Sequence, residues 1–576
     1  MHRLALAILI ALAMPALEAR AQSSLYPTDA CVAAKLDAAA AYCAKAVVTA
    51  IYPTNPMIGA ARQRLADAWT AAESASSAAG VSCSDTTATA DEMIAAIDGA
   101  AAQAVADAAA ASSQGGWACI SQRQLIVGQV CQQVLQLQAK HMRTRSADRT
   151  REKLDASLAS IPGKIDARLG TCSGGPNGAT LASFGGDVAD AATFAAFVSP
   201  RVSSDWTMVT PDAQVPYDGK TLEPICSRGT PWVFFVKRGT VNKTLMYYQG
   251  GGACWDHTTC TFPTYKVSAG ASDNPANASS GFANLNNPDN PFKDWNAVFV
   301  PYCTGDIHWG DAVQDYKQGQ LSVTIRHKGF VNAQVAEKWA REHFVDPDQV
   351  FVTGSSAGAY GAIVNSLSLQ EKVWPSADFA VLGDAGNGVI TQDFLVNDLG
   401  KWGIEQNLPD WIPGLQVPLT ELSIAELYTD SALFYPTHRF ANYATAYDGG
   451  QGGQTGFYNV MLHPDDLGAW LRWWVPSCDW NAQMRALVYD TASRASNYRY
   501  YIGSGSRHTM WGSDKVYTDT TGDVPTIVSW VDAMLAGTPD WVNVESDDPG
   551  LLLPGDPRPD PADPPYTEDG RVDCSE

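Results

Sequence analysis

The chain has 576 residues, a hydrophobic content of 45% and a formal net charge of −22 at pH 7. A chain of this length is too long for one hydrophobic core and predicts about two domains. The hydrophobic content is that of a folded globular protein. The negative charge argues against nucleic-acid binding, because the phosphates would be repelled.

The first 21 residues have the pattern of a signal peptide. Arg3 gives a basic start, an apolar run covers residues 4–17, and the small residues Ala19 and Ala21 form a cleavage-site pattern. The apolar run is too short to span a bilayer, and we see no later apolar run of membrane-helix length. We therefore expect a secreted or periplasmic protein without a membrane span.

Residues 22–175 predict a helical, cysteine-containing domain that folds independently. Alanine-rich runs with periodic Leu, Ile and Val indicate its helices, which we place at residues 33–50, 60–79, 91–111 and 122–158. The glycine-rich segment that begins at Cys172 indicates a linker, which we place at residues 176–200.

Residues 201–544 predict the catalytic domain. Residues 243–249 have the composition of a strand and run into Gly250, Gly251 and Gly252. Consecutive glycines let a backbone approach a ligand closely. We expect the N–H groups of Gly251 and Gly252 to form an oxyanion hole together with the N–H of Ala357. The alternative is an ordinary flexible glycine turn.

A second motif of this domain surrounds Ser356. A β-branched run ends in Gly354, Ser355, Ser356, Ala357 and Gly358 and continues into a small-residue segment. This is the strand, sharp turn and helix that present a serine nucleophile, and glycines two residues before and after leave room for the turn. Ser356 is the predicted nucleophile, since Ser355 fits the spacing less well.

A serine nucleophile needs a histidine base and an acid, in the order Ser, Asp or Glu, His. Of the downstream histidines, His463 stands beside Pro464 in a polar turn, and His438 follows a proline and precedes Arg439. His508 instead follows the aromatic strand predicted at residues 498–503. His508 is therefore the predicted base. Asp448 and Asp384 each follow a predicted strand, and spacing alone does not choose between them.

The last segment, residues 545–576, is rich in proline and aspartate. Its composition predicts an acidic, extended tail that buries little surface.

The twelve cysteines divide evenly, six before and six after the predicted linker: Cys31, Cys43, Cys83, Cys119, Cys131 and Cys172, then Cys226, Cys254, Cys260, Cys303, Cys478 and Cys574. Each domain can thus be cross-linked by itself in an oxidising compartment. Cys254 and Cys260 are close enough for a local bridge, and Cys574 can tie the tail to Cys478. No Cys-x-x-Cys or His-Glu-x-x-His motif occurs, so we expect no metal site and no cofactor.

Five motifs in order resemble those of the pectin acetylesterase/Notum family: residues 250–256, 290–296, 300–306, 354–358 and 506–508. Members are secreted carboxylesterases with an α/β-hydrolase fold, and the resemblance covers roughly residues 200–540. It implies Ser356 as nucleophile and His508 as base.

The resemblance also favours Asp448 as the acid, because plant members carry a Tyr-Asp-x-x-Gln segment that Tyr447, Asp448 and Gln451 match. Asp384 resembles a family segment near the site that is not the triad acid. The chain departs from the family at Gly252, where the eukaryotic loop has tryptophan, and in its N-terminal region, which has no counterpart.

We therefore predict a secreted serine esterase with an α/β-hydrolase fold, a mostly parallel sheet with flanking helices, and an added helical domain. Its expected substrate is an O-acyl ester with an acetyl or other short acyl group, carried by a polysaccharide such as pectin. The alternative is a polyester depolymerase or lipid-ester hydrolase that uses the same triad and anchors its substrate through the N-terminal domain. A non-catalytic binding protein on an inactive hydrolase scaffold is disfavoured by the intact Ser, His and Asp candidates.

Overall fold

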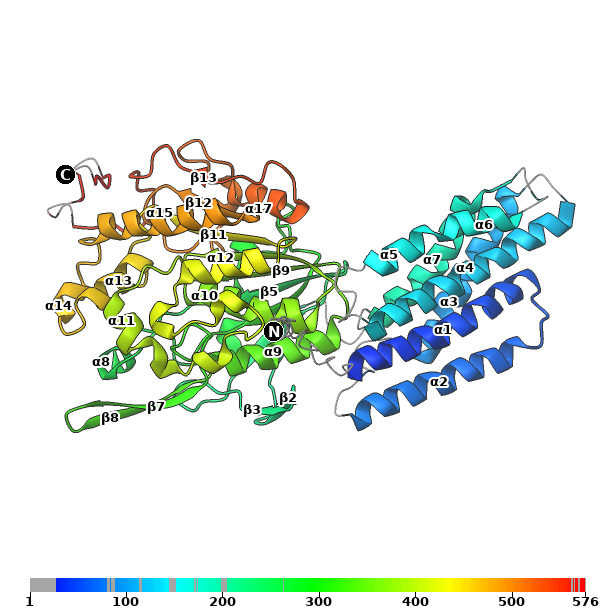
Figure 1. Ribbon diagram of the computed structural model, residues 1–576, viewed down its shortest axis with the longest axis horizontal. Helices are drawn as coiled ribbons and strands as arrows, with labels where there is room; N and C mark the ends of the chain where they lie inside the picture. Colours follow the sequence, from blue (N-terminus) through cyan, green and yellow to red (C-terminus); the bar gives the residue numbers. More distant parts are fainter. Residues whose placement is uncertain are drawn as a thin grey trace, which may run out of the picture.

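The computed structural model describes residues 27–79, 83, 89–112, 116–144, 152–169, 172, 175–197, 205–262, 264–560, 563, 565–567 and 570–574. Figure 1 shows two parts, a helical bundle coloured blue to cyan and a larger part built on a central sheet, coloured green to red. The predicted signal peptide lies outside the described residues.

The described part of the bundle contains helices α1 (Pro27–Ile51), α2 (Ile58–Ala78), α3 (Ala90–Ala111), α4 (Gly116–Thr144), α5 (Glu152–Ala159), α6 (Ile161–Leu169) and α7 (Gly178–Phe197). Alanine favours the helix, and apolar side chains three or four residues apart form the core, as Met93, Ile97 and Ala101 of α3 do. Helix α3 begins with a capping box between Thr89 and Glu92. Three disulfides cross-link the bundle internally: Cys31–Cys83, Cys43–Cys131 and Cys119–Cys172.

The linker predicted at residues 176–200 is wrong, because helix α7 occupies most of that range and packs against α3, α4 and α6. Val188 is fully buried in the bundle core. Gly185 lets α7 approach α4 closely, since a Cβ at this position would lie 2.4 Å from Cβ of Val130. The packing of α7 against neighbouring helices cannot be seen in the sequence, and it outweighs the low helix propensity of the glycines in α7.

The expectation that no later apolar run reaches membrane-helix length is also wrong. Within the described ranges, α3 is the one helix long and apolar enough to cross a membrane. Length and composition alone are weak evidence for a span. The face of α3 that carries Met93 and Ile97 is buried in the bundle core, and α3 packs against α1, α4 and α7.

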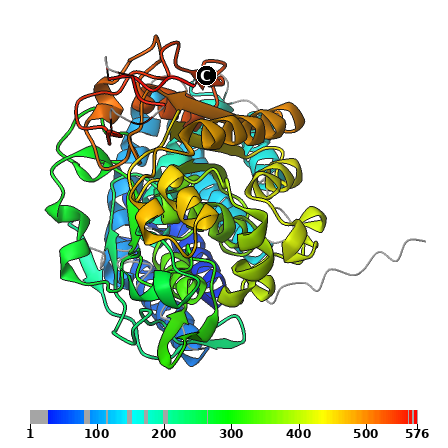
Figure 2. The same cartoon turned by 90° about the vertical axis from the view of Figure 1, so that its left-hand side faces the viewer.

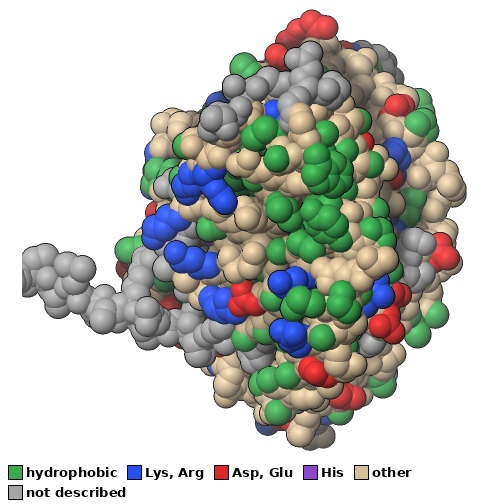
Figure 3. Space-filling view, turned by 90° about the vertical axis from the view of Figure 1, so that its right-hand side faces the viewer, with side chains coloured by type: hydrophobic (Ala, Val, Ile, Leu, Met, Phe, Trp, Pro, Cys, Tyr) green, Lys and Arg blue, Asp and Glu red, His purple; other side chains and the backbone are tan. Residues whose placement is uncertain are grey.

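The far end of the bundle exposes apolar side chains. Figure 3 views this end and shows hydrophobic side chains beside lysines and arginines. Tyr52 and Met57 lie in the α1–α2 connection and Trp117 lies at the start of α4, and all three are exposed.

A nine-stranded sheet forms the centre of the larger part, in the order β1-β4-β6-β5-β9-β10-β11-β12-β13. The strands are β1 (Thr207–Val209), β4 (Phe234–Lys237), β5 (Lys243–Tyr248), β6 (Asn296–Val300), β9 (Gln349–Ser355), β10 (Asp378–Asp384), β11 (Arg439–Thr445), β12 (Tyr498–Gly503) and β13 (Val544–Glu545). Strand β4 pairs antiparallel with β1 and β6, and the remaining pairs are parallel. The predicted mostly parallel α/β sheet is confirmed. Two hairpins lie outside it: β2 (Val215–Tyr217) with β3 (Lys220–Leu222), and β7 (Ala312–Gln318) with β8 (Leu321–His327).

The larger part contains ten α-helices among the described residues. They are α8 (His257–Thr261), α9 (Gly329–His343), α10 (Ala357–Ser368), α11 (Gln392–Asn397), α12 (Ile424–Phe434), α13 (Gln454–Leu462), α14 (Leu467–Trp470), α15 (Ser477–Arg494), α16 (Lys515–Thr518) and α17 (Ile527–Ala536). Successive strand residues point to opposite faces, so Val350 and Val352 of β9 share a core with α9, α10 and α12, while Phe351 packs on the α17 side. Burial on both faces explains the continuous apolar run in β9.

The C-terminal tail is more closely packed than its composition predicts. The disulfide expected between Cys478 and Cys574 is present and joins the tail to α15. Leu552 and Val572 are buried in one cluster with Trp480. The prediction that the tail buries little is therefore wrong for these residues.

The bundle packs against the amino-terminal edge of the parallel strands (Figures 1 and 2). Val345, which precedes β9, belongs to the bundle core, and Ser376, which precedes β10, lies 3.3 Å from His141 Nε2. In open α/β sheets ligands bind at the opposite, carboxyl-terminal edge. Seven-residue β9 separates the two edges by about 20 Å at 3.3 Å per residue.

Candidate active site

Ser356 lies on the turn between β9 and α10, in the strand, turn and helix context that the sequence predicts. Its φ of 57° and ψ of −123° are unfavourable for a residue with a side chain and cost about 1–3 kcal/mol. The turn requires both neighbouring glycines. A Cβ on Gly354 would lie 2.3 Å from the carbonyl oxygen of Gly358, and one on Gly358 would lie 2.0 Å from that of Tyr248. This turn places Ser356 in the wall of a pocket.

Ser355, the alternative nucleophile, is bound to neighbouring side chains beneath the turn. Its hydroxyl donates a hydrogen bond to Oδ2 of Asp384 at 2.6 Å and lies 2.8 Å from the hydroxyl of Tyr247. Ser355 is buried and is absent from the pocket wall. Of the two serines, only Ser356 is open to a ligand.

The structure brings Asp448 and His508 together from adjacent parallel strands. Asp448 follows β11, is fully buried, and accepts a hydrogen bond from Nδ1 of His508 at 2.6 Å. Gln454 holds the same carboxylate through its backbone N–H at 3.0 Å and its Nε2 at 2.7 Å. The two loops are also joined by backbone hydrogen bonds from Tyr447 to Gly505 and from Gly449 to Ser506.

Asp384, the other acid candidate, contacts the backbone beyond the histidine. Its carboxylate accepts the N–H groups of Met510 at 3.0 Å and Trp511 at 3.3 Å, in addition to the Ser355 hydroxyl. Burial raises the pKa of Asp384 to about 6, against these hydrogen bonds, which lower it. Asp384 therefore anchors the chain after His508 and makes no hydrogen bond to the imidazole itself.

The imidazole of His508 lies in the wall of the pocket. Its Nε2 is buried and has no hydrogen-bond partner among the described residues, while the ring lines the same pocket as Ser356. Burial lowers the pKa of His508, but the charge and hydrogen bond of Asp448 and the charge of Asp384 raise it above the ordinary value. Ser356 and His508 are not hydrogen-bonded to each other here, which is common for catalytic pairs without substrate.

The glycine loop touches the nucleophile turn. A Cβ on Gly250 would lie 2.4 Å from the carbonyl oxygen of Ser355, so the two backbones are in contact. Gly252, with φ of 79°, lines the pocket together with Ala357, the first residue of α10, whose N–H has no acceptor within the helix. Gly251 is absent from the pocket wall; a Cβ there would meet the side chains of Tyr302 and Lys266. The predicted Cys254–Cys260 bridge is present just after this loop.

The pocket is lined almost entirely by apolar and aromatic side chains and has a volume of about 80 Å³. Besides the residues above, its wall includes Trp255, Ile307, Trp309, Tyr360, Val389, Ile390, Phe394, Leu399, Trp402, Leu422, Ile424, Phe457 and Met461. Most of them come from segments between β10 and β11 and from α13, which cover the carboxyl-terminal edge of the sheet. The described residues contain no group of three or more His, Cys, Asp or Glu side chains arranged to hold a metal ion.

The remaining sequence candidates lie outside the pocket. Nδ1 of His438 lies 2.6 Å from Oε1 of Gln370, and the backbone oxygen of His463 accepts the indole N–H of Trp470. Gln451, which the Tyr-Asp-x-x-Gln resemblance singled out, is exposed in a turn, and Gln454 binds Asp448 instead. No sequence signal distinguished Gln454, because its role depends on how the loop folds back on Asp448.

The fold is that of an α/β-hydrolase, with Ser356 on the turn that follows a central strand. Residues 218–402 match the family model described as Pectinacetylesterase, and this match includes the glycine loop and Ser356 but ends before Asp448 and His508. It confirms, over this segment, the resemblance to the pectin acetylesterase/Notum family.

Relatives share only part of the chain. Palmitoleoyl-protein carboxylesterase NOTUM of Homo sapiens is 25% identical over 176 residues, which are 28% of this chain and 34% of that protein. Pectin acetylesterase 11 of Arabidopsis thaliana is 26% identical over 208 residues, which are 32% of this chain and 50% of that protein. The chain thus spans between about a third and half of the length of these relatives.

The chain is similar to a solved structure described as the Wnt deacylase Notum from Drosophila. The aligned part covers 62% of this chain and 99% of the solved chain, with 15% sequence identity and a TM-score of 0.40.

Proposed function

We propose that the protein is a serine carboxylesterase with Ser356 as nucleophile, His508 as base and Asp448 as acid. The observation that supports this best is one pocket whose wall includes both Ser356, on its strained turn, and His508. Among the described residues Nε2 of His508 has no hydrogen-bond partner, and its Nδ1 is bound to buried Asp448. This is the arrangement that activates a serine hydroxyl in acyl transfer.

In the proposed reaction, Oγ of Ser356 attacks the ester carbonyl as His508 Nε2 takes its proton. The N–H groups of Gly252 and Ala357, with Gly251 as the third candidate, hold the negative oxygen. The alcohol leaves with the proton from His508, and water activated by the same imidazole releases the acid from Ser356. Asp448 stays ionised and stabilises the imidazolium. No step uses a metal or an organic cofactor.

The wall of the pocket favours an apolar acyl group. Each methylene of the acyl chain buried there contributes about 0.8 kcal/mol, or about fourfold in kcat/KM. This supports the alternative substrate predicted from the sequence, a lipid ester or a polyester, over an acetylated polysaccharide. The six disulfides support action in an oxidising compartment, outside the cytoplasm.

The test compares p-nitrophenyl acetate, butyrate and octanoate with acetylated pectin, in the native protein and in Ser356→Ala. We expect hydrolysis that requires Ser356, with kcat/KM about 15-fold higher for butyrate than for acetate from two buried methylenes. A preference for acetate and release of acetate from pectin would instead support the polysaccharide substrate. Hydrolysis that persists in Ser356→Ala would refute the assignment of the nucleophile.

A further inference from the structure

The C-terminal tail, here residues 546–574, runs behind the loop that carries His508. We call residues 504–511 the histidine loop. The N–H of Gly505 donates to the carbonyl oxygen of Pro549 at 3.0 Å, and the hydroxyl of Ser506 donates to that of Pro557 at 2.5 Å. The tail thus binds the two residues that shortly precede His508.

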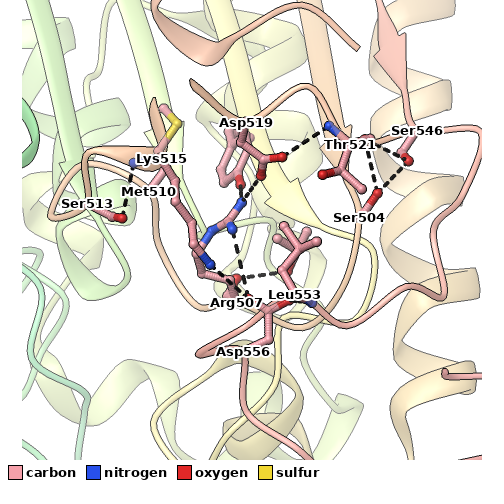
Figure 4. Close-up of polar contacts among 12 residues, drawn as sticks. Ser504, Arg507, Met510, Ser513, Lys515, Asp519, Thr521, Ser546, Leu553 and Asp556 are labelled. Carbon is pink, nitrogen blue, oxygen red and sulfur yellow. Dashed lines mark hydrogen bonds and ion pairs between the residues drawn. The ribbon is translucent and has the colours of Figure 1, made fainter. Parts of the chain in front are cut away.

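A buried carboxylate of the tail, Asp556, contacts the histidine loop at two residues, Ser506 and Arg507 (Figure 4). Its side chain is fully buried, and Oδ2 accepts the N–H groups of Leu553 at 3.1 Å and Ser506 at 3.4 Å. Its Oδ1 faces two cations, Nη1 of Arg507 at 3.9 Å and Nζ of Lys515 at 3.8 Å. Asp556 therefore supplies negative charge next to the loop that precedes the imidazole.

The loop has no room to move toward the tail. Gly505 has a φ of 83°, and a Cβ there would lie 2.2 Å from Oδ2 of Asp556. On its other side, the histidine loop is bound by the loop that carries Asp448. Oγ1 of Thr445 donates a hydrogen bond to the carbonyl oxygen of Arg507 and accepts one from the N–H of Asp448. The histidine loop is therefore held between the tail and the loop of Asp448.

The tail can hold the loop because it is itself fixed. Cys574 is bonded to Cys478 of α15, and Leu552 and Val572 are buried beside Trp480. Ser546 at the start of the tail lies 2.6 Å, Oγ to Oγ, from Ser504 at the start of the loop (Figure 4). The tail is thus attached at both ends, and Asp556 lies between the attachments.

We propose that Asp556 is a positioning residue of the active site, which holds the backbone of residues 505–507 and thereby keeps the His508 imidazole between Asp448 and Ser356. This inference rests on the proposed esterase function. Displacement of a catalytic group by about 1 Å can cost about 100-fold in rate. The tail is then part of the catalytic unit, although its composition is that of an appendage.

The test compares Asp556→Ala with Asp563→Ala in the full-length protein. Asp563 is the matched control, because it is a carboxylate of the same tail that pairs with Arg472 on the surface and, among the described residues, makes no hydrogen bond or ion pair with the histidine loop. We expect kcat for p-nitrophenyl butyrate to fall about 100-fold in Asp556→Ala with KM within about twofold, while the control keeps the native values. The low-field proton resonance of His508 Nδ1–H should be lost or broadened only in Asp556→Ala. Native kcat and a native resonance in Asp556→Ala would overturn the proposal.

Two further variants cover a failure of Asp556→Ala to fold. Asp556→Asn keeps an oxygen that can accept the N–H groups of Ser506 and Leu553, so kcat should lie between those of the native protein and Asp556→Ala. The double variant Cys478→Ser, Cys574→Ser releases the end of the tail without a change in the loop, and its kcat should also fall. Native kcat in both variants would refute the role of the tail. Absence of Ser356-dependent turnover in the native protein would refute the proposed function instead, so the two failures are distinguishable.

Discussion

Asp448→Asn tests the proposed acid most directly. Oδ1 of Asp448 accepts both His508 Nδ1 and the backbone N–H of Gln454, and Oδ2 accepts Gln454 Nε2. Every neighbour is thus a donor, and an amide at this position necessarily presents its NH₂ group to one of them. An amide that turns its NH₂ toward His508 makes Nδ1 an acceptor, so the ring proton moves to Nε2. A protonated Nε2 cannot accept the proton of Ser356.

The expected loss of kcat is about 10⁴-fold, the size of the effect when a triad histidine is left in the wrong tautomer, which corresponds to about 5.4 kcal/mol of transition-state stabilisation. Steady-state hydrolysis of p-nitrophenyl butyrate measures it, with thermal unfolding as the check on folding. The matched variant is Asp384→Asn, in which an amide oxygen remains to accept the N–H groups of Met510 and Trp511. There we expect a loss of at most about tenfold, equivalent to one hydrogen bond. A larger loss in Asp384→Asn than in Asp448→Asn, at equal thermal stability, would show that the acid is misassigned.

Three further outcomes follow from the geometry. The raised pKa of His508 means that the base becomes protonated at a higher pH than a free imidazole, so the acid limb of kcat/KM should have its midpoint above about 6.5; a lower midpoint in the pH profile would contradict this. A chain that starts at Asp205 should keep its turnover of p-nitrophenyl butyrate, because the bundle contacts the sheet at the edge opposite the pocket; an inactive or aggregated product, with the full-length protein active and soluble, would show that the bundle is part of the folded hydrolase. Gly252→Ala should lower kcat and the melting temperature together, because φ is 79° and the new Cβ would lie 2.0 Å from the carbonyl oxygen of Thr264; native values of both would show that the loop can rearrange.

Local features of the site are predictable from the sequence, because their causes lie within a few residues. A turn at Ser356 without space for Cβ needs glycine at 354 and 358, and both requirements are visible in the sequence. A strand buried on both faces must be apolar throughout, so β9 was recognisable; the α/β-hydrolase fold was expected from the serine turn and from the family resemblance. The bridge between Cys254 and Cys260 needs only a short loop to close.

The physical cause of features that depend on distant contacts is visible only in the tertiary structure. Spacing left Asp384 and Asp448 equal, and only the family resemblance favoured Asp448. The two differ because the register of β11 beside β12 brings Asp448 to the imidazole, while Asp384 meets the backbone that follows it. The same dependence explains why Gln454 was missed.

The composition of a segment gives its intrinsic preference, and burial against a partner can override that preference. Glycines near residue 176 indicated a linker, yet the segment forms a helix because α3 and α4 offer it an apolar surface. Prolines and aspartates indicated an extended tail, yet a disulfide and two buried side chains fix it behind His508. The sequence by itself therefore determined the fold class and the serine turn, and its family resemblance favoured Asp448 as the partner of the histidine. The wall of the pocket and the position of the tail required the packing of segments that are far apart in the chain.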